Sequence, residues 1–246
     1  MNLRLAFFAL ISFGVHSAFA QTIETDRPDQ TEAATLVPVG GIQLEAGVAG
    51  WTSADAATTG YTLPTALVRY GLHERFEIRV VGQRDQEQPN FIDLEEPWTT
   101  TSAWDLGAKV AGWSTESSDM CILAHYKHRP GSTHGGQVRL SYAKPLPKGF
   151  SLGTNLGVGW SQAGMNEVAQ RSLEYTLALG YAPSESTYLY VEGFGAGGGL
   201  AADAGFAWRP TMLSQFDVSM GWAGTMETSY FALGWSKLWL PNRTRE

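Results

Sequence analysis

The sequence is poor in cysteine, in charge and in long apolar runs. One cysteine among 246 residues, Cys121, excludes an internal disulfide framework and a cysteine-rich zinc site. Charged residues are 17% of the chain, below the usual quarter, and no basic cluster offsets the net charge of −7, which argues against a nucleic-acid partner. The motifs CxxC and HExxH and the phosphate-binding loop are missing, so we expect no metal site and no cofactor.

Only the start of the chain is continuously apolar, and it has the features of an export signal. Arg4 is followed by the apolar stretch LAFFALISFGV and by the small-x-small pattern AFA at Ala18–Ala20. This run is shorter than the roughly 18 apolar residues of a spanning helix, so an uncleaved anchor is the weaker alternative. We expect a signal peptide over residues 1–20, cleaved after Ala20, and export of the mature chain.

The mature chain alternates apolar and polar residues with a period of two. In GIQLEAGV, Ile42 and Leu44 fall on one face, and Gln43 and Glu45 fall on the other. Such alternation over about ten residues predicts strands with one apolar and one polar face. Twelve candidate strands start near residues 40, 61, 75, 103, 119, 135, 150, 172, 186, 200, 214 and 229.

Two all-β folds have such faces, a soluble sandwich and an outer-membrane barrel. Strands of about 9–11 residues are typical of membrane barrels, whereas soluble strands run to about 5–6. Short connections such as GLHE and KPLPKG alternate with longer ones such as DQEQPNFIDLEEPWTTT, as periplasmic turns alternate with outer loops. Aromatic residues near segment ends fit interface girdles: Trp51, Tyr70, Trp98, Trp113, Tyr142, Trp160, Tyr181, Trp208, Trp222 and Trp239. We therefore predict a transmembrane antiparallel up-and-down β-barrel of about 12 strands over residues 40–240, with a C-terminal tail over residues 241–246.

The stretch between the leader and the first strand, ETDRPDQTE, carries five charges in nine positions around a proline. Pro28 fixes its own backbone angle and disfavours helix at Arg27. A basic side chain facing lipid at the membrane midplane costs about 2–4 kcal/mol, whereas a polar lumen accepts charge. We therefore expect residues 21–39, the N-terminal segment, to fold into the barrel mouth as a plug. Its lumen residues would be Asp26, Arg27, Pro28, Asp29 and Glu32.

A charged segment in the lumen needs charged partners on the wall. Inward positions of the predicted strands carry Glu45, Arg69, Glu77, Arg79, Asp105, Lys109, Arg139, Glu174 and Asp217. We expect Arg27 to pair with a lumen carboxylate such as Glu45 or Glu77, and Asp26 or Asp29 to pair with a lumen arginine. An exposed periplasmic tail is the alternative to this plug.

The stretch from Thr25 to Gly47 resembles the N-terminus of the family "MetA-pathway of phenol degradation", a family of outer-membrane transporters. The matching residues are Thr25, Asp26, Arg27, Pro28, Asp29, Thr31, Glu32, Val37, Pro38, Gly40, Gln43 and Glu45. LVRYGLHERFEIRV is similar to the second hairpin of the family, with Arg69, Tyr70, Gly71, Leu72, Glu74, Arg75 and Glu77. The resemblance is specific over residues 25–81 and architectural beyond, and LPNRTRE after Trp239 departs from the aromatic residue on which such barrels commonly finish. It implies a barrel that passes small solutes, aromatic or hydrophobic compounds among them.

Three functions stay open on this sequence. The first is a porin-like channel in the outer membrane of a Gram-negative cell, whose partners are outer-membrane lipid and a small-molecule solute. Its mixed lumen charges predict no strong ion preference, and its oligomeric state stays open. The second is a non-conducting structural or binding barrel. The third, a lipid-modifying enzyme, is disfavoured, because His125 and His128 fall on opposite faces of a strand and the loop of Ser132 and His134 has no acid. We therefore predict no enzyme activity and no catalytic residues.

Overall fold

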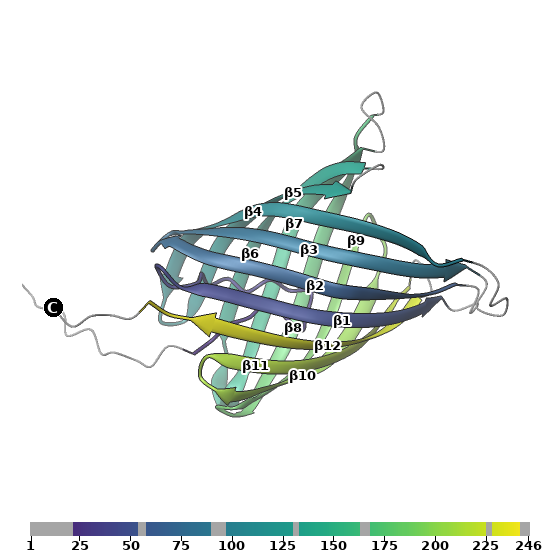
Figure 1. Ribbon diagram of the computed structural model, residues 1–246. Coiled ribbons are helices and arrows are strands. Elements are labelled where there is room, and N and C mark those ends of the chain that lie inside the picture. Colours follow the sequence, from purple (N-terminus) through teal and green to yellow (C-terminus); the bar gives the residue numbers. More distant parts are fainter. Residues whose placement is uncertain are drawn as a thin grey trace, which may run out of the picture.

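The structure, a computed structural model, describes residues 22–53, 58–89, 97–129, 133–162, 168–224 and 228–241. Within these ranges twelve antiparallel strands close into one barrel, in which each strand pairs with its neighbours in sequence and β1 pairs with β12 (Figure 1). The predicted fold class is therefore confirmed. The expected signal peptide lies outside the described residues, as does the C-terminal tail beyond residue 241. No helix in the described part of the chain is long and apolar enough to cross a membrane.

The observed strands match the predicted ones in number and order. They are β1 (Ile42–Ser53), β2 (Thr58–His73), β3 (Phe76–Pro89), β4 (Thr99–Thr115), β5 (Ser118–Arg129), β6 (Thr133–Pro145), β7 (Phe150–Gln162), β8 (Gln170–Ser184), β9 (Thr187–Ala196), β10 (Ala201–Thr211), β11 (Ser214–Ala223) and β12 (Thr228–Trp239). The largest difference is at β4, which begins at Thr99 rather than near residue 103. A single 3₁₀ turn, Pro147–Gly149, separates β6 from β7 in the described chain.

The period of two separates the inside of the barrel from the outside. On β8, Thr176 is 6% exposed whereas Leu177 is 56% exposed, and the same contrast recurs around the wall. An apolar belt therefore faces outward and a polar lining faces inward, which is the arrangement of a barrel in lipid. The girdle prediction was wrong for Trp51, which lines the lumen. The reason is parity, because Trp51 lies on the same face of β1 as the inward Glu45.

The N-terminal segment lies inside the barrel rather than outside it. Figure 1 draws it in purple within the end of the barrel where β12 finishes. The backbone N–H of Ile23 donates to Met212 O at 2.6 Å, in the turn between β10 and β11. Ile23, Val37 and the inward Leu238 form a small buried apolar cluster at this end. The described part of the segment is thus held where it enters the lumen and where it joins β1.

Candidate functional site

The N-terminal segment crosses the lumen and touches opposite walls. Its Thr31 hydroxyl lies 2.7 Å from Thr176 Oγ1 on β8 and donates to Glu192 on β9. The backbone N–H of Glu32 donates to Asn155 Oδ1 on β7 at 2.7 Å, and that of Val37 donates to Glu77 Oε2 on β3 at 2.7 Å. Because these strands lie far apart around the barrel, the segment forms a constriction.

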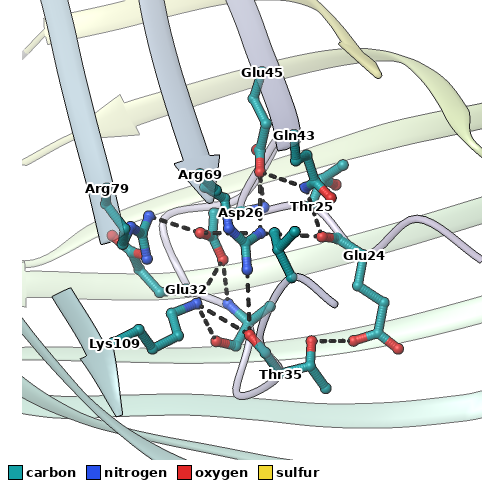
Figure 2. A network of polar contacts seen from close by, with 12 residues as sticks. Glu24, Thr25, Asp26, Glu32, Thr35, Gln43, Glu45, Arg69, Arg79 and Lys109 are labelled. Carbon is teal, nitrogen blue, oxygen red and sulfur yellow. Dashed lines mark hydrogen bonds and ion pairs between the residues drawn. The ribbon is translucent and has the colours of Figure 1, made fainter. Parts of the chain in front are cut away.

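Asp26 is the centre of the ionic network that docks the segment (Figure 2). Its carboxylate lies 2.7 Å from Arg79 Nη2, 3.4 Å from Arg69 Nη1 and 3.4 Å from Lys109 Nζ. It also accepts a hydrogen bond from the backbone N–H of Ala33 at 2.7 Å. Burial by itself would raise the pKa of Asp26, but the cations of Arg69, Lys109 and Arg79 hold it well below its usual range. The carboxylate is therefore ionised in the docked state.

Arg69, one of the wall cations around Asp26, also pairs with carboxylates on the two neighbouring strands. Arg69 donates from Nε to Glu77 Oε1 at 2.9 Å and from Nη2 to Glu77 Oε2 at 3.0 Å, a bidentate pair. Arg69 Nη1 also reaches Glu45 Oε1 at 3.1 Å. These side chains are at most 1% exposed. Each charge has therefore lost its hydration and is stabilised by its ion-pair partners instead.

Further contacts extend the network to the rest of the segment. Arg79 Nη1 lies 2.6 Å from Glu32 Oε2, and Lys109 Nζ donates to Ala33 O at 2.8 Å. The backbone N–H of Asp26 donates to Glu45 Oε2 at 2.9 Å. The wall therefore binds both the side chains and the backbone of the segment.

Arg27 reaches the other side of the barrel. Its Nη2 lies 3.3 Å from Asp217 Oδ1 on β11 and 3.3 Å from Leu233 O on β12. Gly47 and Gly234 are opposite each other in the β1–β12 register, and a Cβ at either position would lie within 2.7 Å of the guanidinium. Arg27 therefore pairs with a lumen carboxylate as expected, but this carboxylate is Asp217 and not Glu45 or Glu77, because Arg69 occupies both of those.

The remaining predicted lumen residues lie apart from the Asp26 network. Arg139 and Glu174 pair with each other on the wall, Nε to Oε2 at 2.9 Å. Asp105 lies 3.8 Å from His125 Nδ1. Pro28 is buried within the segment and follows a cis peptide bond.

Asp29 has an environment opposite to that of Asp26. Burial, followed by the nearby carboxylates of Glu192, Asp203 and Asp26, raises the pKa of Asp29 well above its usual range. The prediction that Asp26 or Asp29 pairs with a lumen arginine is met by Asp26. Asp29 instead faces the side of the lumen formed by β9 and β10.

Several residues that contact the segment were not singled out from the sequence. Gln215 donates from Nε2 to Arg27 O at 3.1 Å, and Glu192 accepts from the backbone N–H of Gln30 at 2.7 Å. Gln43, Asn155 and Thr176 also contact it. Their signal in the sequence was the period of two, which places each on the polar face of its strand.

Two hollows lie on either side of the constriction. The outer hollow, about 870 Å³, opens toward the longer connections and is lined by residues that include Arg27, Asp29, Trp51, Thr101, Arg129 and Tyr230. The inner hollow, about 370 Å³, lies toward the short turns and is lined by residues that include Arg27, Asp29, Asp119, Lys144, Arg209 and Gln215. Arg27 and Asp29 line both, so these two residues of the segment lie between the hollows.

The histidines do not gather at the constriction. His125 points inward, whereas His128 and His134 lie across β5 and β6 on the exposed face with Nδ1 atoms 3.3 Å apart. Ser132 lies outside the described residues. Among the described residues, no group of three or more His, Cys, Asp or Glu side chains is arranged to hold a metal ion.

No protein-family profile matches the chain, and no curated protein is similar to it in sequence. Solved structures with the same fold do exist. The COG4313 outer membrane channel from Pseudomonas putida F1 is similar with a TM-score of 0.62 at 10% identity, over 84% of this chain and 98% of that one. The KdgM porin in complex with disordered oligogalacturonate gives 0.55 at 8%, over 80% and 98%. The NanC porin gives 0.52 at 10%, over 78% and 98%.

These likenesses concern the barrel as a whole. At such low identity they show the fold and not the family, so the resemblance to the phenol-degradation transporters stays a prediction. The fold that they show is that of outer-membrane, porin-like barrels.

Proposed function

We propose that the protein is an outer-membrane channel for small solutes whose pore is constricted by residues 21–39. The observation that carries this proposal is a pair of hollows inside a closed barrel, separated by a segment that is docked by ion pairs. A barrel with a purely structural role would need neither hollow. The belt of exposed apolar side chains and the likeness to outer-membrane porins support the location.

Conductance in planar lipid bilayers tests the channel. Mature protein that begins at Gln21 should give current steps, and removal of residues 21–38 should enlarge them. Folding of both proteins is verified by the anomalous migration of unheated samples in detergent gels. If neither folded protein gives current, the channel is rejected. That result would favour the non-conducting barrel, for which the buried ionic network that fills part of the lumen is the supporting observation.

The solute class is tested separately from conduction. A liposome-swelling panel of sugars, carboxylates and phenols compares neutral, anionic and aromatic solutes in one assay. Faster swelling with phenols would support the solute class that the phenol-degradation family implies. The enzyme alternative is tested with purified lipids, on which we expect neither hydrolysis nor acyl transfer.

A further inference from the structure

Two histidines on the outside of the barrel meet across the hairpin of β5 and β6. His128 and His134 are directly opposite each other in the register of these strands. His125 is buried inside the barrel, so the period of two places His128 on the outward face of β5. Arg129, the next residue, lines the outer hollow, which places the pair at the outer end of the barrel. The two imidazoles are therefore separate from the constriction.

The Nδ1 atoms of the two imidazoles lie close together. Nδ1 of His128 is 3.3 Å from Nδ1 of His134, and the ring centroids are 4.8 Å apart. A tetrahedral metal ion that binds imidazole nitrogens at about 2.0–2.1 Å holds two of its ligand atoms about 3.3–3.4 Å apart. The two nitrogens thus have the spacing of neighbouring ligands of one ion, with both strands in their present positions.

A phenol oxygen lies beside the two nitrogens. Oη of Tyr126 is 2.7 Å from Nδ1 of His134. Tyr126 precedes His128 by two positions, so both side chains lie on the outward face of β5. Two nitrogens and one oxygen therefore gather at one place on the outside of β5 and β6.

Hydrogen bonding alone does not satisfy these three atoms. An imidazole nitrogen has one site in the plane of its ring, which is either an N–H donor or a lone pair. Nδ1 of His134 has two neighbours, Oη of Tyr126 and Nδ1 of His128, and it can form a full hydrogen bond with only one of them. A metal ion accepts a lone pair from each of the three atoms at once. The contacts of His134 are therefore a second sign, beside the spacing of the nitrogens, that a cation binds here.

The surroundings fix one imidazole and leave the other accessible. The Trp104 ring on β4 lies against His128, with centroids 5.0 Å apart, whereas His134 is exposed. Within the described ranges, no carboxylate lies within 4 Å of either imidazole. Neither ring is thus already paired with an acid, and an ion can reach both from the outside of the barrel.

We propose that His128, His134 and Tyr126 form a binding site for a divalent transition-metal ion, zinc or copper, at the outer rim of the barrel. Imidazole suits both ions, and copper(II) should bind more tightly than zinc. Magnesium and calcium prefer oxygen ligands and should not bind. Water fills the positions that the three side chains leave open.

This site is of a kind that motif searches miss. It contains two histidines and a phenol, and differs from a group of three or more His, Cys, Asp or Glu, which the described residues do not contain. Only the hairpin brings the two histidines together, so the metal-binding motifs of the sequence do not include them. The site does not depend on the proposed channel function.

Isothermal titration calorimetry of the untagged mature protein in detergent micelles tests the proposal, with ZnCl₂ and MgCl₂ as probes. Zinc should bind and magnesium should not. His128→Asn and His134→Asn should each abolish zinc binding, and Tyr126→Phe should weaken it several-fold. These side chains face outward near strand ends, so the barrel should fold, which the shift of unheated protein in detergent gels verifies.

Electron paramagnetic resonance of the protein loaded with CuCl₂ identifies the ligands. The spectrum should show splitting from two imidazole nitrogens in the unchanged protein and from at most one in either histidine variant. His73→Asn is the matched control, because this exposed histidine at the end of β2 lies away from the pair, and it should leave both measurements unchanged.

Three results would overturn the site. The first is zinc binding that survives in both His128→Asn and His134→Asn. The second is zinc binding that His73→Asn removes as well. The third is a folded, unchanged protein that binds neither zinc nor copper, which would make the histidine pair a hydrogen-bonded contact only.

Discussion

Nη2 of Arg79 lies 2.7 Å from Oδ2 of Asp26, and this contact joins β3 to the N-terminal segment. Arg79 is 1% exposed and cannot leave the wall to find solvent. Asp26 also forms ion pairs with Arg69 and Lys109, which are equally buried in the wall. One carboxylate therefore balances buried charge from three strands, and the docked segment and the barrel wall depend on each other.

Asp26→Asn should release the segment without unfolding the barrel. Loss of one member of a buried ion pair costs about 3–5 kcal/mol, mainly because the remaining charges are left uncompensated. The strand ladders do not pass through Asp26, so the barrel should keep its gel shift. Conductance should rise, and a protease on the inner side should cut near Asp29 faster. Glu24→Gln, an exposed carboxylate on the same segment, is the control and should change neither. Identical behaviour of the two variants would mean that Asp26 does not hold the segment.

Arg27 and Asp217 should behave as one unit. Arg27→Ala and Asp217→Asn each remove the pair that holds the segment at β11, so each should speed cleavage near Asp29. The double variant should be little worse than either single variant, because groups in direct contact couple rather than add. Arg27→Ala combined with Glu77→Gln serves as a comparison and should be additive, since Glu77 binds Arg69 instead. Additive effects for Arg27 and Asp217 would contradict the pairing.

The barrel was predictable from the sequence because lipid outside and water inside impose a period of two on every strand. The inward position of Trp51 follows from the same parity as Glu45, and the girdle argument overlooked it. The partner of Arg27 was not predictable, because closure of β1 onto β12 brings β11 close to residues near the N-terminus. Gly47 and Gly234 gave a usable signal, since small residues at facing inward positions leave room for a large side chain.

Arginine substitutions at Leu177 and Thr176 on β8 and at Thr101 on β4 test which face meets lipid. Leu177→Arg places a charge in the apolar belt and should destabilise the barrel by about 2–4 kcal/mol if it lies at the membrane midplane. Thr101→Arg, which faces the outer hollow, should be mild. Thr176→Arg should keep the barrel but displace the segment, because Thr176 bonds Thr31. Urea unfolding in lipid vesicles measures the first effect and protease cleavage measures the last. An equal loss of unfolding free energy in Leu177→Arg and Thr101→Arg, or a larger loss in Thr101→Arg, would contradict the assigned faces.

Docking of the segment should depend on pH through two carboxylates with opposite shifts. The pKa of Asp26 is lowered in the docked state, by cations that outweigh the effect of burial. Its contribution to docking is therefore complete above the ordinary aspartate value of about 3.9 and is lost only in stronger acid. The pKa of Asp29 is raised in the docked state, by burial and neighbouring carboxylates. Its contribution is complete below about 3.9 and is lost as the pH rises toward the docked value.

Above about pH 5 the contribution of Asp26 is complete, so of these two carboxylates only Asp29 should still change docking, and through it the segment should loosen as the pH rises. The charged and titratable groups that face Asp29 are Glu192 on β9, Asp203 on β10, Asp26 and Arg27 on the segment, and Arg209, Tyr188 and Tyr190 on the wall. The protease rate near Asp29 should climb with pH in the unchanged protein and climb less in Asp29→Asn, whose amide does not ionise. A free peptide of residues 22–38, cut at each pH, corrects for the protease itself. A slope that is the same in Asp29→Asn as in the unchanged protein would assign the pH dependence to the wall carboxylates instead of Asp29. A rate that falls as the pH rises would contradict the raised pKa and, with it, the acidic surroundings assigned to Asp29.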